Sequence, residues 1–214
     1  MDTKKKEPVG NFKNPRAAWS KGAVAVKDHD FHSEDLGMAS PYGIYDVHAN
    51  TGSVFAGTSH DTPQFAVASI QKWWRYHGNR RYGKENRLLI LADCGRSNGC
   101  RCRAWKYQLQ QFSNPYGLSI TVRHLPPGTS KWNPIEHRLF SQISRSWAGS
   151  PLDSFDTVKN CISTTATKTG PAVKAYIDPK VYELGTRITG KQMRQLSIQT
   201  IDPLPTWNYT IAPA

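Results

Sequence analysis

The sequence predicts an α/β protein built around a mixed sheet. Strand-like and helix-like segments alternate in the order β-β-α-β-α-β-α, which is typical of strand–helix–strand units with parallel strands. A continuous apolar run at 87–93, RLLILAD, has the pattern of a buried parallel strand and ends on a carboxylate. Two short β-rich runs near residue 50 are separated by turn residues and indicate an antiparallel hairpin at an edge.

The first part of the chain combines an irregular opening with this hairpin. Residues 8–40 are rich in Gly, Pro, Asn, Lys and Asp, so we expect a loop there, with one short strand near 23–26. The runs YGIYDV at 42–47 and SVFAG at 53–57 are the hairpin strands. Asn50, Thr51 and Gly52 lie between them and are the expected turn.

Helical periodicity and strand patterns alternate in the middle of the chain. Asp61, with Gln64 three residues later, predicts the start of a helix that ends at Gly78. Its apolar stripe consists of Phe65, Ile70, Trp73 and Trp74. After the strand at 87–93 we expect a helix at about 101–112, a strand at 117–125 and a helix at about 134–147. A helix near 152–165 and short irregular pieces complete the chain.

The charge balance favours a polyanionic partner. Lys and Arg total 28 against 16 Asp and Glu, a net charge of +12, and aromatic residues lie among the basic ones at 72–84 and 103–108. This combination favours nucleic acid over an acidic membrane surface, because no long basic amphipathic helix is present. The longest apolar run, 88–92, is far shorter than the roughly 20 residues of a membrane span. The four cysteines lack paired zinc-site spacing and are expected to be reduced thiols.

Three acidic residues are distinguished by their positions, and each has a simpler interpretation. Asp93 ends the strand at 87–93, where ligands bind in open α/β sheets, but a turn carboxylate is equally placed to bond the following backbone. Glu136 heads the stripe of Phe140, Ile143 and Trp147, yet Asn133, Pro134 and Glu136 also form a capping-box pattern. Asp2 by itself is a residue of a disordered terminus.

Several segments resemble one bacterial family from the first residues to the last. They are DTKKKEPVGNFKN, PYGIYD, LADCGRSNG, HLPPGTSKWNPIEHRLFSQIS and WNYTIAP. Together they resemble the ISAzo-type insertion-sequence transposases of the DDE transposase and retroviral-integrase superfamily. The resemblance implies an RNase H-like mixed sheet flanked by helices, in which Asp2, Asp93 and Glu136 are the three metal-binding catalytic acids. It implies two Mg²⁺ or Mn²⁺ ions, which suit oxygen-only ligands and in-line phosphoryl displacement.

DNA contacts are expected around these acids. Lys4, Lys5 and Lys6 follow the first acid, and Arg96 and Asn98 follow the second, where they are suited to backbone phosphates. The third acid is surrounded by Ser130, Lys131, Trp132, Asn133 and Arg138. The helix N-terminus there favours phosphate, and Trp132 is suited to base stacking, although packing against its own loop is the alternative.

The chain begins where the family's first strand ends. We therefore expect a copy truncated at its N-terminus, whose central first strand is largely missing. The expected organisation is a catalytic domain at 1–148 and a helical and irregular extension at 149–214 packing on it. The predicted function is DNA strand cleavage and transfer at insertion-sequence ends.

The alternatives are a truncated remnant that only binds DNA, and another nuclease such as a resolvase. The implied partners are terminal inverted repeats, target DNA and further copies of the chain when active, with no membrane. The implied location is the bacterial cytoplasm, in association with the nucleoid.

Overall fold

The computed structural model confirms the α/β class and divides the chain into two compact units. It describes residues 1–17, 19, 21–27, 36–126, 128–165 and 170–214. Unit 1 consists of Met1–Asp2, Asp61–Asn133 and Tyr182–Ala214, and unit 2 consists of Thr3–His60 and Pro134–Val181. Residues 149–181 thus group with unit 2 and residues 182–214 with unit 1. The catalytic-domain and extension boundaries expected from the sequence stay a prediction.

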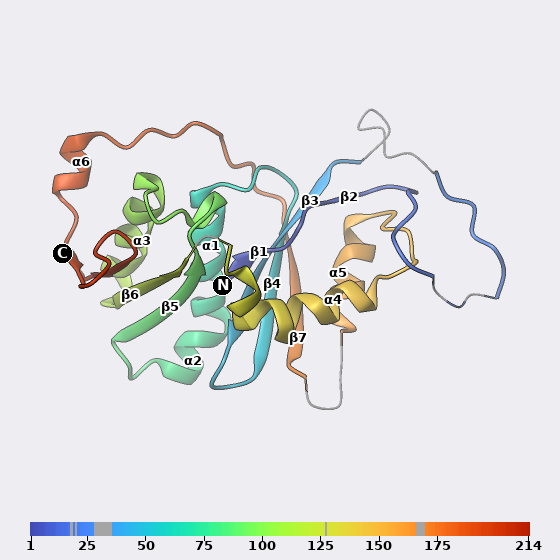
Figure 1. Cartoon of the computed structure of the whole chain (residues 1–214), viewed down its shortest axis with the longest axis horizontal. Coiled ribbons are helices and arrows are strands. Elements are labelled where there is room, and N and C mark those ends of the chain that lie inside the picture. Colours follow the sequence, from blue (N-terminus) through green and yellow to red (C-terminus); the bar gives the residue numbers. More distant parts are fainter. Residues whose placement is uncertain (18, 20, 28–35, 127, 166–169) are drawn as a thin grey trace. The chain divides into compact units, whose positions relative to one another are not determined.

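The sheet of unit 2 is built on the predicted hairpin (Figure 1). Its strand order is β1 (Asp2–Thr3), β3 (Met38–Asp46), β4 (Thr51–Gly57) and β7 (Ala172–Asp178), and β2 (Glu7–Pro8) also pairs with β3. β3 and β4 are antiparallel, as expected, whereas β4 and β7 are parallel. The turn lies at 47–50 rather than 50–52, and Asn50 has the left-handed φ of 49° that suits Asn.

Helices of unit 2 pack on this sheet through a continuous apolar core. They are η5 (Glu136–Phe140), α4 (Ser141–Ser146) and α5 (Phe155–Ser163). The predicted stripe is confirmed, because Phe140, Ile143 and Trp147 are all buried in the core cluster with Val54 and Ala56 of β4. The predicted helix near 152–165 is confirmed with tighter bounds, and Ser154 caps it by accepting from the Thr157 backbone N–H at 3.1 Å.

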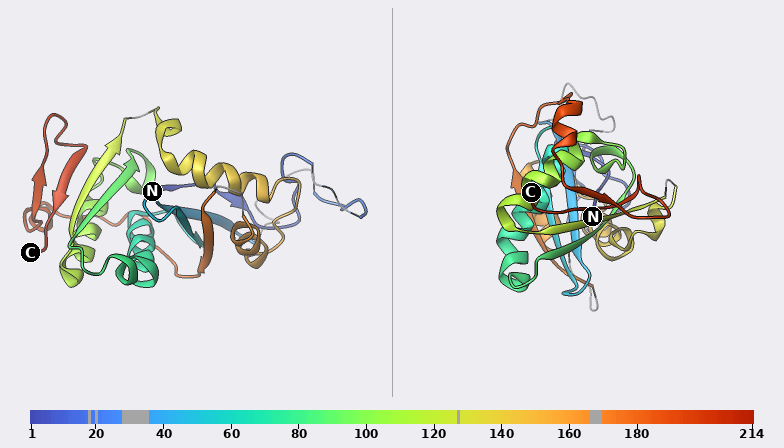
Figure 2. Two further views of the ribbon diagram at one scale, coloured as in Figure 1. Left: turned by 90° about the horizontal axis from the view of Figure 1, so that it is seen from below. Right: turned by 90° about the vertical axis from the view of Figure 1, so that its left-hand side faces the viewer.

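The sheet of unit 1 contains the predicted parallel pair. β5 (Arg87–Asp93) pairs with β6 (Ser119–Leu125) in parallel, with Asp93 opposite Leu125, and α3 (Arg103–Tyr116) connects them. β9 (Asn208–Ile211) and β8 (Ile198–Thr200) extend the sheet as antiparallel neighbours, which Figure 2 shows near the chain's C-terminus. The expectation that β5 is a fully buried strand was wrong. Side chains alternate between the two faces of a strand, so Ile90 is buried whereas Leu89 is 61% exposed.

The first helix of unit 1 differs from its prediction at both ends. It comprises α1 (Pro63–Trp73), η2 (Trp74–Gly78) and α2 (Asn79–Tyr82). Thr62, not Asp61, is the N-cap and accepts from the Phe65 backbone N–H at 3.2 Å, because Pro63 occupies the first helical position. Gly78 does not end the helix, since its φ of −61° and ψ of −51° are helical. The four residues of the predicted apolar stripe are all buried.

Two sequence expectations about irregular segments were wrong. The region after residue 165 contains β7, α6 (Gly190–Arg194), β8 and β9, and the strands that pair with β7 and β9 lie far away in the sequence. No strand forms at 23–26; instead Lys27 forms a single bridge with Phe12, and residues 28–35 of the expected loop lie outside the described ones. None of the helices in the described parts of the chain has the length and apolarity needed to cross a membrane.

Candidate active site

Asp93 lies at the end of β5, where a chain of buried hydrogen bonds holds its backbone. His124 is in β6, one position before the partner of Asp93, and its Nδ1 lies 3.1 Å from the Asp93 carbonyl oxygen. A carbonyl only accepts, so Nδ1 carries the proton and Nε2 accepts from the Tyr209 hydroxyl at 3.2 Å. Trp105 Nε1 in turn donates to the Tyr209 oxygen at 2.9 Å. His124, Tyr209 and Trp105 therefore each have a defined hydrogen-bonding role in this network.

Burial keeps this network neutral. Desolvation lowers the pKa of His124 to about 4, against the opposing effect of its bond to Asp93, and nearby Lys106 lowers it further. Desolvation likewise raises the pKa of Tyr209, although its bond from Trp105 acts in the other direction. The neutral imidazole is the form that the hydrogen-bond geometry requires. At neutral pH the network thus fixes the end of β5 without adding charge beside the Asp93 carboxylate.

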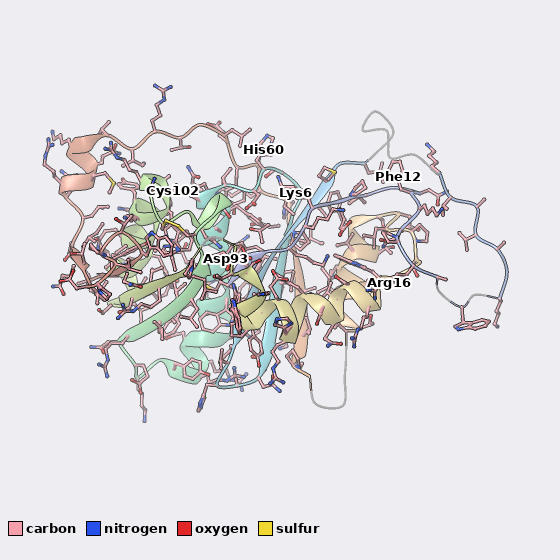
Figure 3. All side chains as sticks on the ribbon, in the orientation of Figure 1. Lys6, Phe12, Arg16, His60, Asp93 and Cys102 are labelled. Atoms are coloured by element: carbon pink, nitrogen blue, oxygen red, sulfur yellow. A yellow bond between two sulfur atoms is a disulfide. The ribbon has the colours of Figure 1, made fainter. Side chains whose placement is uncertain are left out.

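The Asp93 side chain is oriented by Asn133. Asn133 Nδ2 donates to Asp93 Oδ1 at 3.1 Å, and Asn133 is 1% exposed. The 3-10 turn η4 (Ser130–Trp132) positions this amide, since the Asn133 backbone N–H donates to the Ser130 carbonyl at 2.8 Å. Asn133, expected to contact DNA, is therefore a buried partner of the carboxylate. Figure 3 labels Asp93 at the end of its strand.

Asp2, like Asp93, belongs to unit 1, and the residue before it is bonded to β5. The Met1 nitrogen donates to the carbonyl oxygen of Leu91, a residue of β5, at 2.6 Å. Burial lowers the pKa of the Met1 amine to about 6, while the carboxylates of Asp2 and Asp93 both oppose this by attracting the positive charge. The Met1 nitrogen therefore lies in the field of both carboxylates. This arrangement, together with an all-oxygen donor pair, fits a hard divalent cation such as Mg²⁺ or Mn²⁺.

Glu136 belongs to unit 2 and has a different environment. It begins η5 and is half-buried at the head of the apolar stripe. Lys4 is attracted electrostatically to Glu136, forms an ion pair with Glu7 at 3.3 Å and has its Nζ 4.4 Å from the Trp147 ring centroid. Desolvation nevertheless lowers the pKa of Lys4. Among the described residues, no three or more His, Cys, Asp or Glu side chains form a ready metal-binding group.

The predicted DNA-contacting residues divide by exposure. Lys4 is buried and Lys6 half-buried, whereas Lys5 is exposed. Asn98 is also buried, and Arg96 begins the turn η3 (Arg96–Asn98). The exposed members around the third acid are Ser130, Lys131, Trp132 and Arg138. Trp132 is 68% exposed, with the Lys131 Nζ 5.5 Å from its ring centroid, so packing against its own loop does not bury it.

Two features next to Asp93 were not predicted from the sequence. The network of His124, Tyr209 and Trp105 joins residues up to 104 positions apart, and only the register of His124 beside Asp93 in the two predicted strands pointed to it. The expectation of reduced thiols was wrong for Cys94 and Cys100, which form a disulfide. The turn after Asp93 brings their Cα atoms to 4.9 Å, within the range a disulfide spans. Cys102 and Cys161 are free thiols.

The chain matches one protein-family model over almost its whole length. That model is described as the Rhodopirellula transposase DDE domain, and it matches residues 1–213. The chain therefore belongs to this family of transposase DDE domains, which confirms the resemblance seen in the sequence. Comparison with curated proteins and with solved structures gives no significant match.

Proposed function

We propose that this protein is the catalytic region of a DNA transposase that cleaves and transfers strands at insertion-sequence ends. The observation that carries the proposal is the family match over residues 1–213, joined to two of the three expected acids near one buried amine. The parallel β5–β6 pair and the antiparallel β3–β4 hairpin lie in separate sheets, and they are the two kinds of strand pairing that the RNase H-like fold that we propose combines. Asp2, Asp93 and Glu136 are assigned as the catalytic acids.

The assigned acids would hold two Mg²⁺ or Mn²⁺ ions. When bound, such ions activate the attacking oxygen and stabilise the leaving oxygen of a phosphoryl transfer. Asn133 donates to Asp93 Oδ1 and so would orient the carboxylate that holds an ion. His124 keeps the Asp93 backbone at the strand end, and it stays neutral there. Hydrogen bonds from His124 and Asn133 thus orient one acid before any metal arrives.

The basic and aromatic side chains near the assigned acids are proposed to hold the DNA backbone. A net charge of +12 attracts phosphates, and the exposed residues Lys5, Lys131 and Arg138 are suited to direct contacts. Trp132, at 68% exposure, is suited to stacking on an unpaired or terminal base. Lys4 is proposed to act through Glu136, because it is buried and attracted to that acid. Terminal inverted repeats, target DNA and further copies of the chain are the proposed partners, at the bacterial nucleoid.

A nicking assay with DNA carrying matched terminal inverted repeats tests this function. With Mg²⁺ or Mn²⁺ we expect cleavage, and Asp2→Asn, Asp93→Asn and Glu136→Gln should each reduce its rate at least about 100-fold. Loss of a group that merely supports a metal ligand already costs roughly 10–100-fold, so loss of a ligand should cost more. Glu85→Gln in unit 1 and Asp156→Asn in unit 2 are exposed matched controls that should retain the wild-type rate.

The same assay separates the alternatives. Salt-sensitive DNA binding without cleavage by the wild-type protein would contradict the proposal and favour a protein that only binds DNA. Cleavage without subsequent joining of the cut end to a target strand would favour a resolvase-type nuclease. Cleavage that survives Asp93→Asn and Glu136→Gln would overturn the assignment of the acids.

A further inference from the structure

Unit 2 contains a cavity of about 610 Å³ that none of the assigned acids lines. Its walls are the N-terminal segment between Lys4 and Pro8, the loop residues 12–16 with Lys27, and the helix α4 with the residues that follow it. Figure 3 labels Phe12 and Arg16 on this loop. The volume falls within the range of about 300–1,000 Å³ that is usual for small-molecule sites. A cavity of this size is large enough to hold one nucleotide.

The side chains around the cavity are strongly basic. Its cationic members are Lys4, Lys5, Lys13, Arg16 and Lys27, and Glu7 is the carboxylate among them, so the lining carries a net charge of +4. Lys4 and Glu7 form an ion pair with each other. The other four cations are exposed. Phe12 and Trp147 supply an apolar wall, and both are at most 5% exposed.

The backbone that carries these cations is fixed by hydrogen bonds to its surroundings. The Lys13 N–H donates to the Lys27 carbonyl at 3.0 Å and the Lys27 N–H donates to the Asn11 carbonyl at 2.9 Å, so two segments of the loop are joined. Asn14 Nδ2 donates to the carbonyls of Trp147 at 2.9 Å and Ser150 at 3.1 Å. These bonds hold the loop against the end of α4, so the backbone that carries Lys13, Arg16 and Lys27 has a defined position.

The backbone conformation of Arg16 also indicates a ligand-binding position. Its φ of 76° lies in the left-handed region, which is uncommon for a residue with a long side chain. The carbonyl of the preceding residue, Pro15, accepts the Gly149 N–H at 3.0 Å, so the chain is anchored immediately before the strained position. Backbone strain of this kind is concentrated at ligand-binding positions, because the surrounding structure must hold it in place.

Phosphate groups of a single DNA strand match this chemistry. Exposed Lys and Arg side chains around a concavity bind phosphodiesters, and an apolar wall contacts the sugar or base between them. A sphere of the cavity's volume is only about 10–11 Å across, which is too narrow to admit a DNA duplex, since the major groove of a duplex is by itself roughly 12 Å wide. An unpaired strand has the right width.

We propose that this cavity, which we call the basic pocket, binds one unpaired nucleotide of a DNA strand end or overhang. Lys5, Lys13, Arg16 and Lys27 hold its flanking phosphates. This inference rests on the proposed function, because it assigns a strand-end subsite to the same transposase. Lys4 lines the pocket and interacts with Glu136, so the subsite belongs to the unit that carries the third assigned acid.

Fluorescence anisotropy in EDTA tests the pocket independently of catalysis. The probes are a labelled single-stranded oligonucleotide, a blunt duplex, and the same duplex with an unpaired overhang. We expect Lys13→Glu/Arg16→Glu to raise the Kd for the single strand and the overhang by at least about 10-fold. The slope of log Kd against log salt should fall by about 0.7 for each phosphate that the variant no longer neutralises. The Kd for the blunt duplex should change less than about 3-fold.

A matched control keeps the change in charge constant. Lys174→Glu/Lys191→Glu reverses two exposed lysines outside the pocket, one in each unit, and should leave the preference for an overhang intact. Equal weakening of binding in the two double variants, or equal weakening for blunt and overhang DNA, would overturn the proposal. The anisotropy assay contains EDTA, so it does not depend on cleavage. Failure of cleavage with a retained pocket effect therefore counts against the proposed function alone.

A measurement on the wild-type protein covers the case in which the double variant does not fold. The oligonucleotide should protect Lys13 and Lys27 from acetylation by at least about 5-fold more than it protects Lys174, since bound phosphates shield the contacting amines. Unchanged acetylation of Lys13 and Lys27 would overturn the proposal. Equal protection by polyglutamate would overturn it too, by assigning the pocket to acidic peptides.

Discussion

Asp93 and Glu136 are held in position by opposite kinds of interaction. Asp93 ends a strand whose backbone is bonded to His124, and its side chain accepts from Asn133, so polar groups with defined donors and acceptors fix it. Glu136 begins a helical segment that is fixed by the apolar residues Phe140, Ile143 and Trp147, with Lys4 as its charged neighbour. A polar network is sensitive to protonation, whereas apolar packing is sensitive to the removal of volume.

The largest expected effect comes from removing volume beneath Glu136. Phe140 is 3% exposed and packs over Gly43, where a Cβ atom would overlap its ring. Phe140→Ala should lower the free energy of unfolding by about 3–5 kcal/mol, because the cavity that it leaves cannot fully close. Urea denaturation at pH 7.5 measures this decrease. Trp132→Ala, which removes an exposed ring, is the control and should change stability by less than about 0.5 kcal/mol.

A second expected effect is specific to the Asp93 side. The unfolded His124 takes up a proton below pH 6.5, but the folded one does so only near pH 4, so the unfolded state binds more protons between these values. Stability contributed by neutral His124 is therefore present above pH 6.5 and falls by about 2–3 kcal/mol as the pH drops to 4.

Urea denaturation at several pH values, comparing the wild type with His124→Gln, isolates this contribution. The variant should lack that part of the pH dependence, whereas Phe140→Ala should retain it. An exposed control, His48→Gln, should also retain it. Identical pH profiles for the wild type and His124→Gln would show that the network does not depend on a neutral imidazole.

The smallest expected effect concerns the turn that follows Asp93. The Cys94–Cys100 disulfide closes a short loop. In the chain-entropy model, closing a loop of this length lowers the entropy of the unfolded chain and so raises the free energy of unfolding by about 2 kcal/mol. Cys94→Ser/Cys100→Ser should lower stability by about that amount, and dithiothreitol should lower the Tm of the wild type but not of the variant. Cys161→Ser, in unit 2, should keep the wild-type response to dithiothreitol. An unchanged wild-type Tm in dithiothreitol would contradict the prediction.

Local patterns correctly predicted the elements that carry the expected acids. The run at 87–93 is a strand ending at Asp93, and the stripe that follows Glu136 is buried along a helix. Both patterns are periodic over neighbouring residues, so they are visible without knowledge of the fold. The predicted start of the first helix was wrong by one residue, because Asp61 and Thr62 are both good N-caps. Pro63 at the first helical position and the bond from Phe65 identify Thr62 as the cap.

Pairings between distant segments were missed for a physical reason. β7 joins β4, and β9 joins β6, across long stretches of chain, so neither strand is signalled by the residues next to it. The sequence pattern alone therefore predicts an irregular C-terminal region. The disulfide escaped prediction in a similar way, because cysteine spacing does not reveal the turn that brings Cys94 to Cys100.

Motifs and composition are properties of the amino-acid chain alone, so they identify the family, the basic charge and the residues expected to act as catalytic acids. Tertiary structure decided what surrounds those residues. It paired His124 with Tyr209, turned Asn133 towards Asp93, and gathered Lys5, Lys13 and Lys27 around one cavity. Each of these arrangements depends on hydrogen bonds and packing between segments remote in sequence, and such contacts exist only once the chain has folded.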